Sequence, residues 1–378
     1  MLFQAYVNKF PQKYLRKFVH VVPNLRWGGP APPPQLTIFA MTFEYYKKEF
    51  TREAIKSGFS DQNITDCLAY AEQLFASNVP VIYNTSHFSG LVGYKKNYLK
   101  RAALFTRFFY REFDILKKNG KKRKISEPLP SLKEIQIWIL KNILYRIEVS
   151  KYAKAYIPKM SIKQNLIFHK GQQKVLALDI EDFFPSIKQE FVESLFYSFG
   201  YSKILSSLLA KLCCLAEALP QGAPTSPYLS NIYLKSADES ISRFCRDKGI
   251  RYTRYSDDMT FSGDFNEIEL IAYVKLVIGK LQLKINDKKT KLMTPNTRQT
   301  VTGIVVNEKL QVSFAKRNKI RQSVYYINKF GLDNHMLKVK IKKANYLAHL
   351  LGQINFILQI NPTDQEFVEY KNFLQTLK

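Results

Sequence analysis

The sequence predicts an α+β protein with a helical lobe attached to its C-terminal end. Strand-type segments concentrate in the middle of the chain and alternate with helical patterns, whereas the part from Ala315 onward is basic and helical. The chain has 378 residues, of which 46% are hydrophobic. A chain of this length and composition folds, and it builds two or three subdomains rather than one.

Residues 1–40 are predicted to form a flexible basic extension. They contain the stretch "RWGGPAPPPQ", which excludes a helix or a central strand because proline lacks a backbone N–H. Regular patterning begins near Met41, so Met1 and Met41 both remain possible starts of the chain. Residues 41–90 then predict a region of short helices.

Residues 91–170 combine many lysines and arginines with interleaved aromatic residues. The segment "YREFDILKKNGKKRKISEP" predicts two strands joined by a turn at Asn119 and Gly120, because Asn-Gly is a strong hairpin signal. The segment "SLKEIQIWILKNILYRI" follows with the apolar period of a helix.

Residues 171–314 predict the central sheet. "KVLALDI" is an apolar run short enough for a buried strand, while "RYTRYSDDMTFSG" and "TVTGIVVNEKLQVSF" predict two hairpins. Helices are expected between these strands, including one long helix through "YLSNIYLKSADESISRFCRDKG" after the loop "LPQGAPTSP". Residues 315–378 form the helical lobe.

The charge balance narrows the possible partners. Lys and Arg outnumber Asp and Glu by 58 to 31, a formal net charge of +27, which favours a polyanionic partner such as nucleic acid. No apolar run approaches the ~20 residues that span a bilayer, and the first residues lack a secretory pattern. The four cysteines form no C-x-x-C pair, which indicates reduced thiols. We therefore expect a cytoplasmic protein without a membrane partner.

Three aspartates form the candidate catalytic constellation. Asp179 ends the strand "KVLALDI", and Asp257 and Asp258 lie in the turn of the first hairpin. An isolated acidic turn is usually no more than solvated. Two strands that end at one edge, however, place three carboxylates around one point, and their repulsion is relieved when a cation binds. Oxygen-only ligands suit Mg²⁺, and two such ions stabilise the attacking and leaving oxygens of a phosphoryl transfer.

In this order, the motifs "ALDIEDFFPSI", "LPQGAPTSPYLSNIYL" and "YTRYSDDMTFSG" resemble those of a reverse transcriptase. The resemblance covers roughly residues 90–360 and implies a right-hand polymerase with RNA-directed DNA polymerase activity. It divides the chain after the helical region into the fingers (91–170), the palm with some fingers elements (171–314) and an RNA-binding thumb (315–378).

The same resemblance assigns roles to individual residues. Asp179, Asp257 and Asp258 match the catalytic, metal-binding aspartates, and Ile180 would add a backbone carbonyl to the ligands of two Mg²⁺ ions. Phe184 matches the steric gate that leaves no space for a 2′-OH and so favours dNTPs; an ordinary core aromatic is the alternative. The other nucleotide-binding matches are Arg123 in the fingers, Gln221 and Gly222 in the Gly/Pro loop, and Lys289 near the leaving pyrophosphate. A solvated basic turn is the alternative for Arg123, and Lys288 and Lys291 are the alternatives to Lys289.

Further motifs resemble the retron branch of bacterial reverse transcriptases. "TVTGIVVNEKLQV" contains its Val-Thr-Gly element, and "SIKQNLIFHKG" offers an Asn and a His at the spacing of its N-A-x-x-H element, with Leu166 in place of the alanine. Taken alone, such an Asn and His are usually structural. The residues expected to bind RNA or the primer are Tyr255, Val301, Thr302, Gly303, Asn165, His169, Lys340, Lys342 and Lys343.

For a retron, the resemblance implies a cognate structured noncoding RNA that serves as both primer and template. DNA synthesis from dNTPs would start at the 2′-OH of an internal guanosine and give branched multicopy single-stranded DNA (msDNA). The resemblance also implies an anti-phage defence system whose effector is a separate protein, because no second catalytic domain is visible. Two alternatives remain open: a group II intron-type maturase, and an RNA-binding scaffold without polymerase activity. Phe184 disfavours an RNA-synthesising polymerase.

Overall fold

The chain forms two compact units, which we describe from a computed structural model that covers residues 42–116, 120, 122–340 and 345–377. The predicted extension at residues 1–40, and Lys342 and Lys343, lie outside these described residues. The first unit comprises the chain up to Val149 together with Asp182–Tyr233. The second unit comprises Ser150–Glu181 together with the chain from Leu234 onward.

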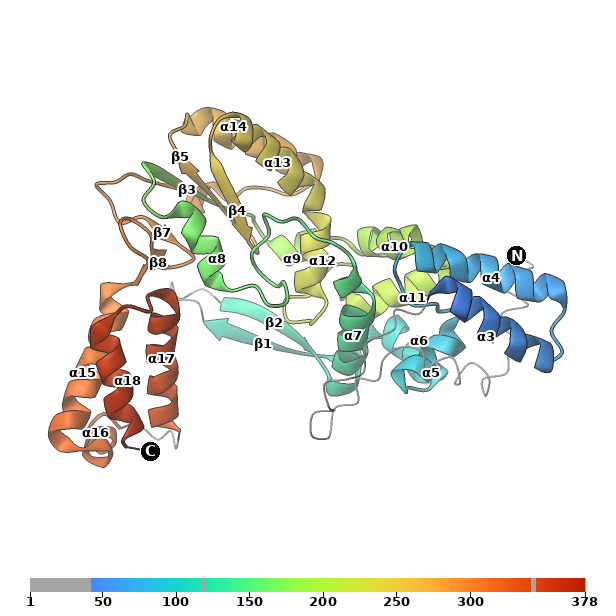
Figure 1. Ribbon diagram of the computed structural model, residues 1–378, viewed down its shortest axis with the longest axis horizontal. Coiled ribbons are helices and arrows are strands. Elements are labelled where there is room, and N and C mark those ends of the chain that lie inside the picture. The colour runs from blue at the N-terminus through green and yellow to red at the C-terminus, as the bar shows by residue number, and fades with distance from the viewer. Residues whose placement is uncertain (1–41, 117–119, 121, 341–344, 378) are drawn as a thin grey trace. The chain divides into compact units, whose positions relative to one another are not determined.

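The first unit begins with short helices, as the sequence predicts. Thr42 and Ser60 cap the first two helices because their hydroxyl groups accept hydrogen bonds from backbone N–H groups of the first turn. The buried rings of Tyr46, Phe50 and Tyr83 form part of the core beneath them. These helices are α3 (Phe43–Lys56), α4 (Asp61–Ala76), α5 (Thr85–Val92) and α6 (Lys96–Leu104) (Figure 1).

The two predicted strands of the basic hairpin are confirmed in the same unit, while Asn119 of the predicted turn lies outside the described residues. Strands β1 (Tyr110–Leu116) and β2 (Lys122–Pro128) pair in antiparallel register over their full length. Helix α7 (Pro130–Asn142) follows and starts with proline, whose missing N–H suits the first turn of a helix. The other α-helices among the described residues of this unit are α9 (Phe183–Ser186), α10 (Gln189–Ser198), α11 (Lys203–Cys213) and α12 (Ser226–Tyr233).

The second unit is built on a four-stranded antiparallel sheet with the strand order β4-β5-β3-β6. Helix α13 packs on β4 and on helix α14, as Figure 1 shows. The side chain of Asn266 caps α14 by accepting two backbone hydrogen bonds. The elements are β3 (Lys174–Asp179), β4 (Arg251–Tyr255), β5 (Asp258–Gly263), β6 (Lys291–Met293), α13 (Lys235–Asp247), α14 (Glu267–Lys280) and the short α8 (Ile162–Leu166).

A small three-stranded sheet follows in the second unit. Strands β7 (Thr300–Val301), β8 (Ile304–Val305) and β9 (Gln311–Val312) pair in this order. The turn between β7 and β8 consists of Thr302 and Gly303, with φ values of 47° and 79°. Positive φ at both central residues is typical of a tight hairpin turn, which explains the local shape of the Val-Thr-Gly element.

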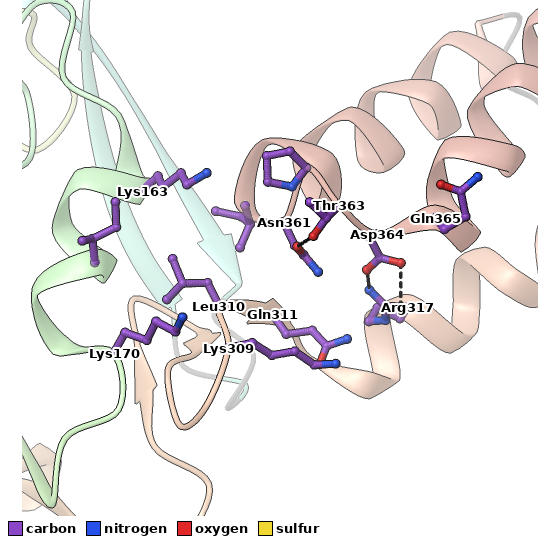
Figure 2. A pocket seen from close by; sticks show the side chains of 13 residues that line it. Lys163, Lys170, Lys309, Leu310, Gln311, Arg317, Asn361, Thr363, Asp364 and Gln365 are labelled. Atoms are coloured by element: carbon purple, nitrogen blue, oxygen red, sulfur yellow. Dashed lines mark hydrogen bonds and ion pairs between the residues drawn. The ribbon is translucent and has the colours of Figure 1, made fainter.

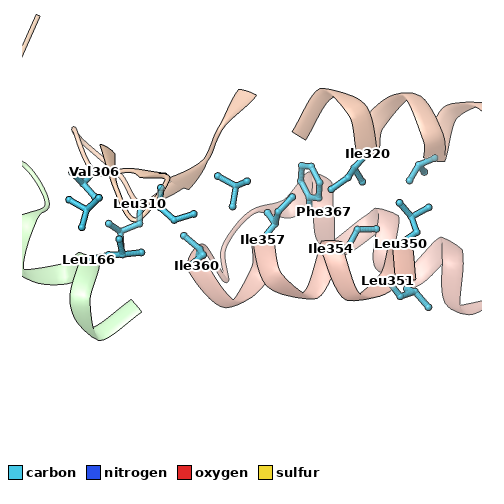
Figure 3. Packing of buried hydrophobic residues seen from close by; sticks show 14 of the residues in the cluster. Leu166, Val306, Leu310, Ile320, Leu350, Leu351, Ile354, Ile357, Ile360 and Phe367 are labelled. Atoms are coloured by element: carbon cyan, nitrogen blue, oxygen red, sulfur yellow. The ribbon is translucent and has the colours of Figure 1, made fainter. Parts of the chain in front are cut away.

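The C-terminal lobe of the second unit is helical, as predicted. Its buried side chains form one hydrophobic cluster with those of the small sheet and with Leu166 of α8 (Figure 3). One buried cluster contains side chains of both the lobe and the small sheet, so we expect the two to move together. The helices are α15 (Phe314–Phe330), α16 (Leu332–Lys338), α17 (Tyr346–Ile360) and α18 (Gln365–Gln375).

Two predictions about the elements are wrong in detail. The long helix expected after the Gly/Pro loop is interrupted at Leu234, so that α12 and α13 are separate helices in different units. The segment expected to be a second hairpin forms three short strands, because the chain turns again between β8 and β9. Across the described residues, we find no helix with the length and apolar character needed to cross a membrane.

Candidate active site

The strand register of the second unit brings the predicted aspartates to one edge of the sheet. Strand β3 pairs with β5 so that Asp179 lies directly opposite Asp258. Tyr255 also pairs with Asp258, which leaves Ser256 and Asp257 as the two-residue turn between β4 and β5. The backbone N–H of Ile180 donates a hydrogen bond of 3.1 Å to the carbonyl oxygen of Asp257. The end of β3 is thereby tied to the acidic turn.

The carboxylates at this edge disfavour each other's ionisation. The pKa of Asp258 is raised to about 6 because surrounding protein desolvates the carboxyl group and because Asp257 and Asp179 add negative charge. The pKa of Asp179 is raised as well, mainly by desolvation and against the effect of Lys289. The ammonium group of Lys289 lies 2.6 Å from Asp179 Oδ1. The positive charge of Lys289 therefore neutralises part of the negative charge at this edge.

The donor set at this edge suits a hard divalent cation. Carboxylate oxygens are the ligands that Mg²⁺ prefers, and the repulsion between Asp179 and Asp258 falls when a cation binds them. As the described residues stand, no three His, Cys, Asp or Glu side chains form a ready-made metal site. Lys289 contacts the Asp179 carboxylate, which a bound cation would also contact. When a cation binds, this lysine would therefore have to move, or both would contact the same carboxylate.

A buried ion pair lies behind the acidic turn and was not predicted from the sequence. Arg254 is fully buried and contacts Asp238 of α13 through two hydrogen bonds, Nε to Oδ1 at 2.9 Å and Nη2 to Oδ2 at 2.7 Å. Arg254 Nη1 also donates to the carbonyl oxygen of Ser256 at 2.9 Å, and Tyr252 donates its hydroxyl to Asp238 at 2.7 Å. The available signal is a basic residue in the interior of a predicted strand, between Thr253 and Tyr255.

Asn165 and His169 are placed differently from the prediction that they contact RNA. Both are fully buried. His169 hydrogen-bonds Ser262 of β5 through Nδ1 and Thr253 of β4 through Nε2, each at 2.7 Å, and Thr253 donates to Asn165 Oδ1 at 2.6 Å. Since the Thr253 hydroxyl donates to Asn165, it accepts from His169. In this structure both ring nitrogens of His169 and the Asn165 side-chain oxygen hold α8 and the following turn against the central sheet, whereas Asn165 Nδ2 is buried without a hydrogen-bond partner among the described residues.

The burial of His169 predicts a loss of stability in acid. Burial lowers its pKa to about 3, so between about pH 3 and about 6.5 the unfolded chain binds a proton that the folded chain does not. Stability therefore rises with pH in this window, and acidification to about pH 5 should cost about 2 kcal/mol. Thermal unfolding is measured at about pH 5 and above this pH window. The loss of stability in acid should be smaller for His169→Gln than for the wild type. The exposed His349, replaced by glutamine, is the control; equal acid effects in all three proteins would contradict the prediction.

Two of the nucleotide-binding residues predicted in the first unit line one cavity. Arg123 of β2 and Gln221 of the Gly/Pro loop both border a cavity of about 930 Å³. Gly222 has a φ of 133°, and a Cβ there would lie 2.7 Å from the carbonyl oxygen of Ser126. Only glycine therefore permits this approach, and the Ser126 N–H donates to Gln221 O at 2.8 Å.

The two phenylalanines of α9 differ in burial. Phe183 is 4% exposed and belongs to the core, whereas Phe184 is half-buried, with a ring centroid 5.2 Å from that of Phe183. The partial exposure of Phe184 is compatible with the predicted gate. Asp182 and Pro185, on either side, line the cavity that Arg123 and Gln221 border.

The other predicted RNA-binding residues lie in two parts of the second unit. Tyr255 is half-buried at the end of β4, and Lys340 is exposed after α16. Val301 is buried, whereas Thr302 and Gly303 form the β7–β8 turn. The Thr302 hydroxyl oxygen is buried and has no hydrogen-bond partner among the described residues.

Comparison with known proteins adds an independent line of evidence. Residues 115–349 match the family described as reverse transcriptase (RNA-dependent DNA polymerase). The retron Ec86 reverse transcriptase of Escherichia coli is 32% identical over 288 residues, which are 75% of this chain and 86% of that protein. The retron Mx162 reverse transcriptase of Myxococcus xanthus is 33% identical over 67% of this chain and 58% of that protein.

Other relatives agree. The retron Ec83 reverse transcriptase of Escherichia coli is 30% identical over 71% of this chain and 88% of that protein. A solved structure of telomerase from Candida albicans with a fragment of telomeric RNA has a TM-score of 0.43 at 10% identity, over 71% of this chain and 63% of that chain. That likeness is too distant to inform on fold or function. From the family match and the retron relatives, the chain belongs to the reverse transcriptase family and, within it, to the bacterial retron reverse transcriptases, so it is an RNA-directed DNA polymerase.

Proposed function

We propose that this reverse transcriptase copies part of a cognate structured noncoding RNA into branched msDNA, starting at the 2′-OH of an internal guanosine. The proposal extends to an anti-phage defence system with a separate effector protein. It is supported by the similarity to retron reverse transcriptases and by the pairing of Asp179 with Asp258 at one edge of the sheet. Reverse transcriptases use divalent metal ions, and the proposed cofactor is two Mg²⁺ ions.

We further propose that Asp179, Asp257 and Asp258 hold these ions, with the carbonyl oxygen of Ile180 as an additional ligand. When bound, the ions would supply charge stabilisation to the attacking and leaving oxygens of the transfer. The protein contributes a fixed geometry, because Asp179 and Asp258 lie on paired strands and Ile180 is hydrogen-bonded to the turn. Lys289 pairs with Asp179. Its ammonium group is proposed to stabilise the negative charge of the leaving pyrophosphate and to donate a proton to it.

The proposed names fingers, palm and thumb follow the predicted boundaries at residues 91–170, 171–314 and 315–378. Arg123, Gln221 and Gly222 are proposed to contact the incoming dNTP, and Tyr255 the primer end. Support comes from the cavity that Arg123 and Gln221 share and from the close backbone approach that Gly222 allows.

Synthesis of RNA-linked DNA tests the proposal directly. The chain is produced together with the transcribed region upstream of its gene, and dNTPs and Mg²⁺ are added to the purified complex. We expect single-stranded DNA that resists RNase and that remains joined to an RNA fragment until a debranching enzyme is added. Asp257→Asn should yield none. Wild-type protein that makes no DNA, or that makes DNA with an ordinary linear primer junction, would overturn the proposal.

The steric gate gives a separate prediction. Phe184→Ala removes the ring that is proposed to pack under the sugar, so discrimination against ribonucleotides should fall about 10- to 200-fold, as expected when one steric group is lost from a pocket. Single-nucleotide incorporation with dGTP and with GTP measures the ratio of kcat/KM. Phe183→Leu is the control, because Phe183 is buried in the core. A wild-type chain that uses both nucleotides equally would contradict the gate assignment.

A further inference from the structure

A second cavity, of about 660 Å³, lies within the second unit (Figure 2). It is bordered by α8 and the segment after it, by the turn between β8 and β9, by the start of α15, and by the segment between α17 and α18. Its volume lies within the about 300–1,000 Å³ of typical ligand pockets. None of the residues proposed above to act in catalysis or RNA binding lines this cavity.

The lining carries positive charge without compensating acids. Lys163, Lys170 and Lys309 line the cavity, and none of them forms an ion pair within the described part of the chain. Asp364 is the acid in the lining, and it is already used: it is buried and accepts hydrogen bonds from Arg317, one of them 3.2 Å long. Figure 2 shows this pair at one side, with the three lysines extending from the opposite walls.

Neutral groups complete the lining. The Thr363 hydroxyl donates to Asn361 Oδ1 at 3.0 Å, which leaves the amide nitrogen of Asn361 as a hydrogen-bond donor. Ile167 and Pro362 expose apolar surface beside these polar groups. Ammonium groups, an amide donor and apolar surface together suit a phosphate attached to a sugar better than a free inorganic ion.

The walls of the cavity are fixed by the buried cluster of the second unit. Leu166, Leu310 and Ile360 belong to this cluster and lie together in Figure 3. Leu310 and Ile360 are direct neighbours of Lys309 and Asn361 in the chain, and Leu166 belongs to the same short helix as Lys163. Because one core holds these three of the four bordering segments, their backbone is pre-organised, and binding loses less conformational entropy than it would on a mobile loop.

We propose that this cavity binds the sugar–phosphate backbone of RNA, with Lys163, Lys170 and Lys309 contacting phosphate groups. The inference rests on the proposed function, because it takes the structured noncoding RNA as the ligand. The formal net charge of +27 favours nucleic acid over an acidic protein as the polyanion. Lysine contacts of this kind add affinity and position the RNA but do not read its sequence.

Salt dependence of binding tests the cavity. A fluorescently labelled RNA hairpin is titrated with the full chain at several KCl concentrations, for the wild type and for Lys163→Gln/Lys170→Gln/Lys309→Gln. Log K falls as log salt rises, and each lost phosphate contact makes this slope shallower by about 1. The slope of the triple variant should therefore be shallower by about 2–3 than that of the wild type, and the variant should bind the hairpin at least about tenfold more weakly at low salt. The matching triple substitution to arginine keeps the charge and should keep the slope.

The control removes equal charge from another surface of the same unit. Arg246→Gln/Lys248→Gln/Lys280→Gln changes exposed residues of α13 and α14 or directly after α13 and should leave the slope as in the wild type. Equal slopes for the cavity variant and the wild type would overturn the inference. Two competition results would also overturn it: displacement of the hairpin from the wild type by ATP or pyrophosphate at equimolar phosphate, or by polyglutamate at equal charge.

Failure of the inference can be told apart from failure of the proposed function. Nucleotide incorporation by the wild-type chain on a short annealed primer and RNA template is measured in the same preparation. An active polymerase whose cavity variant keeps the wild-type slope refutes the cavity alone. The opposite result is a wild-type chain that makes no branched DNA, together with a cavity variant whose salt slope is shallower by about 2–3 as expected. This result refutes the proposed function and supports RNA binding by the cavity.

Discussion

Asp258→Asn is expected to lower the rate of DNA synthesis at least about 10³-fold, because an amide cannot supply the negative charge that holds a divalent cation. A loss of this size corresponds to about 4 kcal/mol of transition-state stabilisation. Asp258 lies directly opposite Asp179 on the paired strand, so its carboxylate cannot be replaced by a neighbour without a shift in register.

The same substitution should leave the fold as stable as the wild type, or make it more stable, at neutral pH. The folded pKa of Asp258, about 6, lies above its unfolded value of about 4. The folded chain therefore binds the extra proton between these values, and stability falls as the pH rises through this window. At neutral pH the folded wild type carries the full repulsion with Asp179, and asparagine removes it.

Two measurements on one preparation separate these effects. Single-turnover incorporation with dNTPs and Mg²⁺ reports the rate, and thermal unfolding with and without Mg²⁺ reports stability. Mg²⁺ should raise the unfolding temperature of the wild type and leave that of Asp258→Asn almost unchanged. Asp264→Asn, at the far end of β5 and exposed, is the control that should keep both properties. A variant that loses activity only because it unfolds would argue against the catalytic assignment.

Much of the fold follows from local sequence patterns. The alternation in "RYTRYSDDMTFSG" predicts a hairpin, and the apolar run "KVLALDI" predicts a strand, with their acids at one edge. The pairing of Asp179 with Asp258 agrees with that expectation. The caps at Thr42 and Ser60 and the proline at the start of α7 are likewise local signals. The interruption at Leu234 has no such signal, because neither proline nor glycine stands there.

Features that depend on distant partners could not be predicted in this way. His169 forms hydrogen bonds with Ser262 and Thr253, and Arg254 forms an ion pair with Asp238. In each case the partner lies on another element. A sequence pattern shows that a polar residue is present but does not show whether it meets a partner inside the protein or faces a ligand. The motif containing Asn165 and His169 therefore predicts RNA contact, whereas the burial of both residues indicates that they hold α8 against the sheet.

Arg254→Ala is expected to destabilise the second unit by about 3–5 kcal/mol and to abolish DNA synthesis. The substitution leaves the Asp238 carboxylate, 1% exposed, without its paired cation, and an uncompensated buried charge has a cost of about this size. It also removes the donor to the Ser256 carbonyl oxygen. Ser256 has a φ of 64°, a conformation that a residue other than glycine keeps only when its surroundings hold it.

Stability and positioning can be separated by removing every member of the buried network. In Tyr252→Phe/Arg254→Met/Asp238→Leu neither charge of this buried ion pair remains, and replacing a buried ion pair by apolar residues of similar volume is often neutral for stability. The triple variant should therefore unfold close to the wild-type temperature, while Arg254→Ala alone unfolds well below it. Incorporation by the triple variant should still be at least about tenfold slower, because the donor to the Ser256 carbonyl oxygen is lost and the turn that carries Asp257 is then held by fewer contacts.

The concentration of Mg²⁺ needed for half-maximal incorporation decides between the two roles of Arg254. If the arginine positions the acidic turn, the triple variant should need more Mg²⁺ than the wild type, since carboxylates held loosely bind a cation less tightly. If the arginine only stabilises the fold, a triple variant with normal thermal stability should show the wild-type rate and the wild-type Mg²⁺ requirement, and the positioning role would then be excluded. The hydrogen bond from Arg254 to Ser256 makes the first outcome the expected one, because it is the contact that joins the buried ion pair to the turn between the catalytic strands.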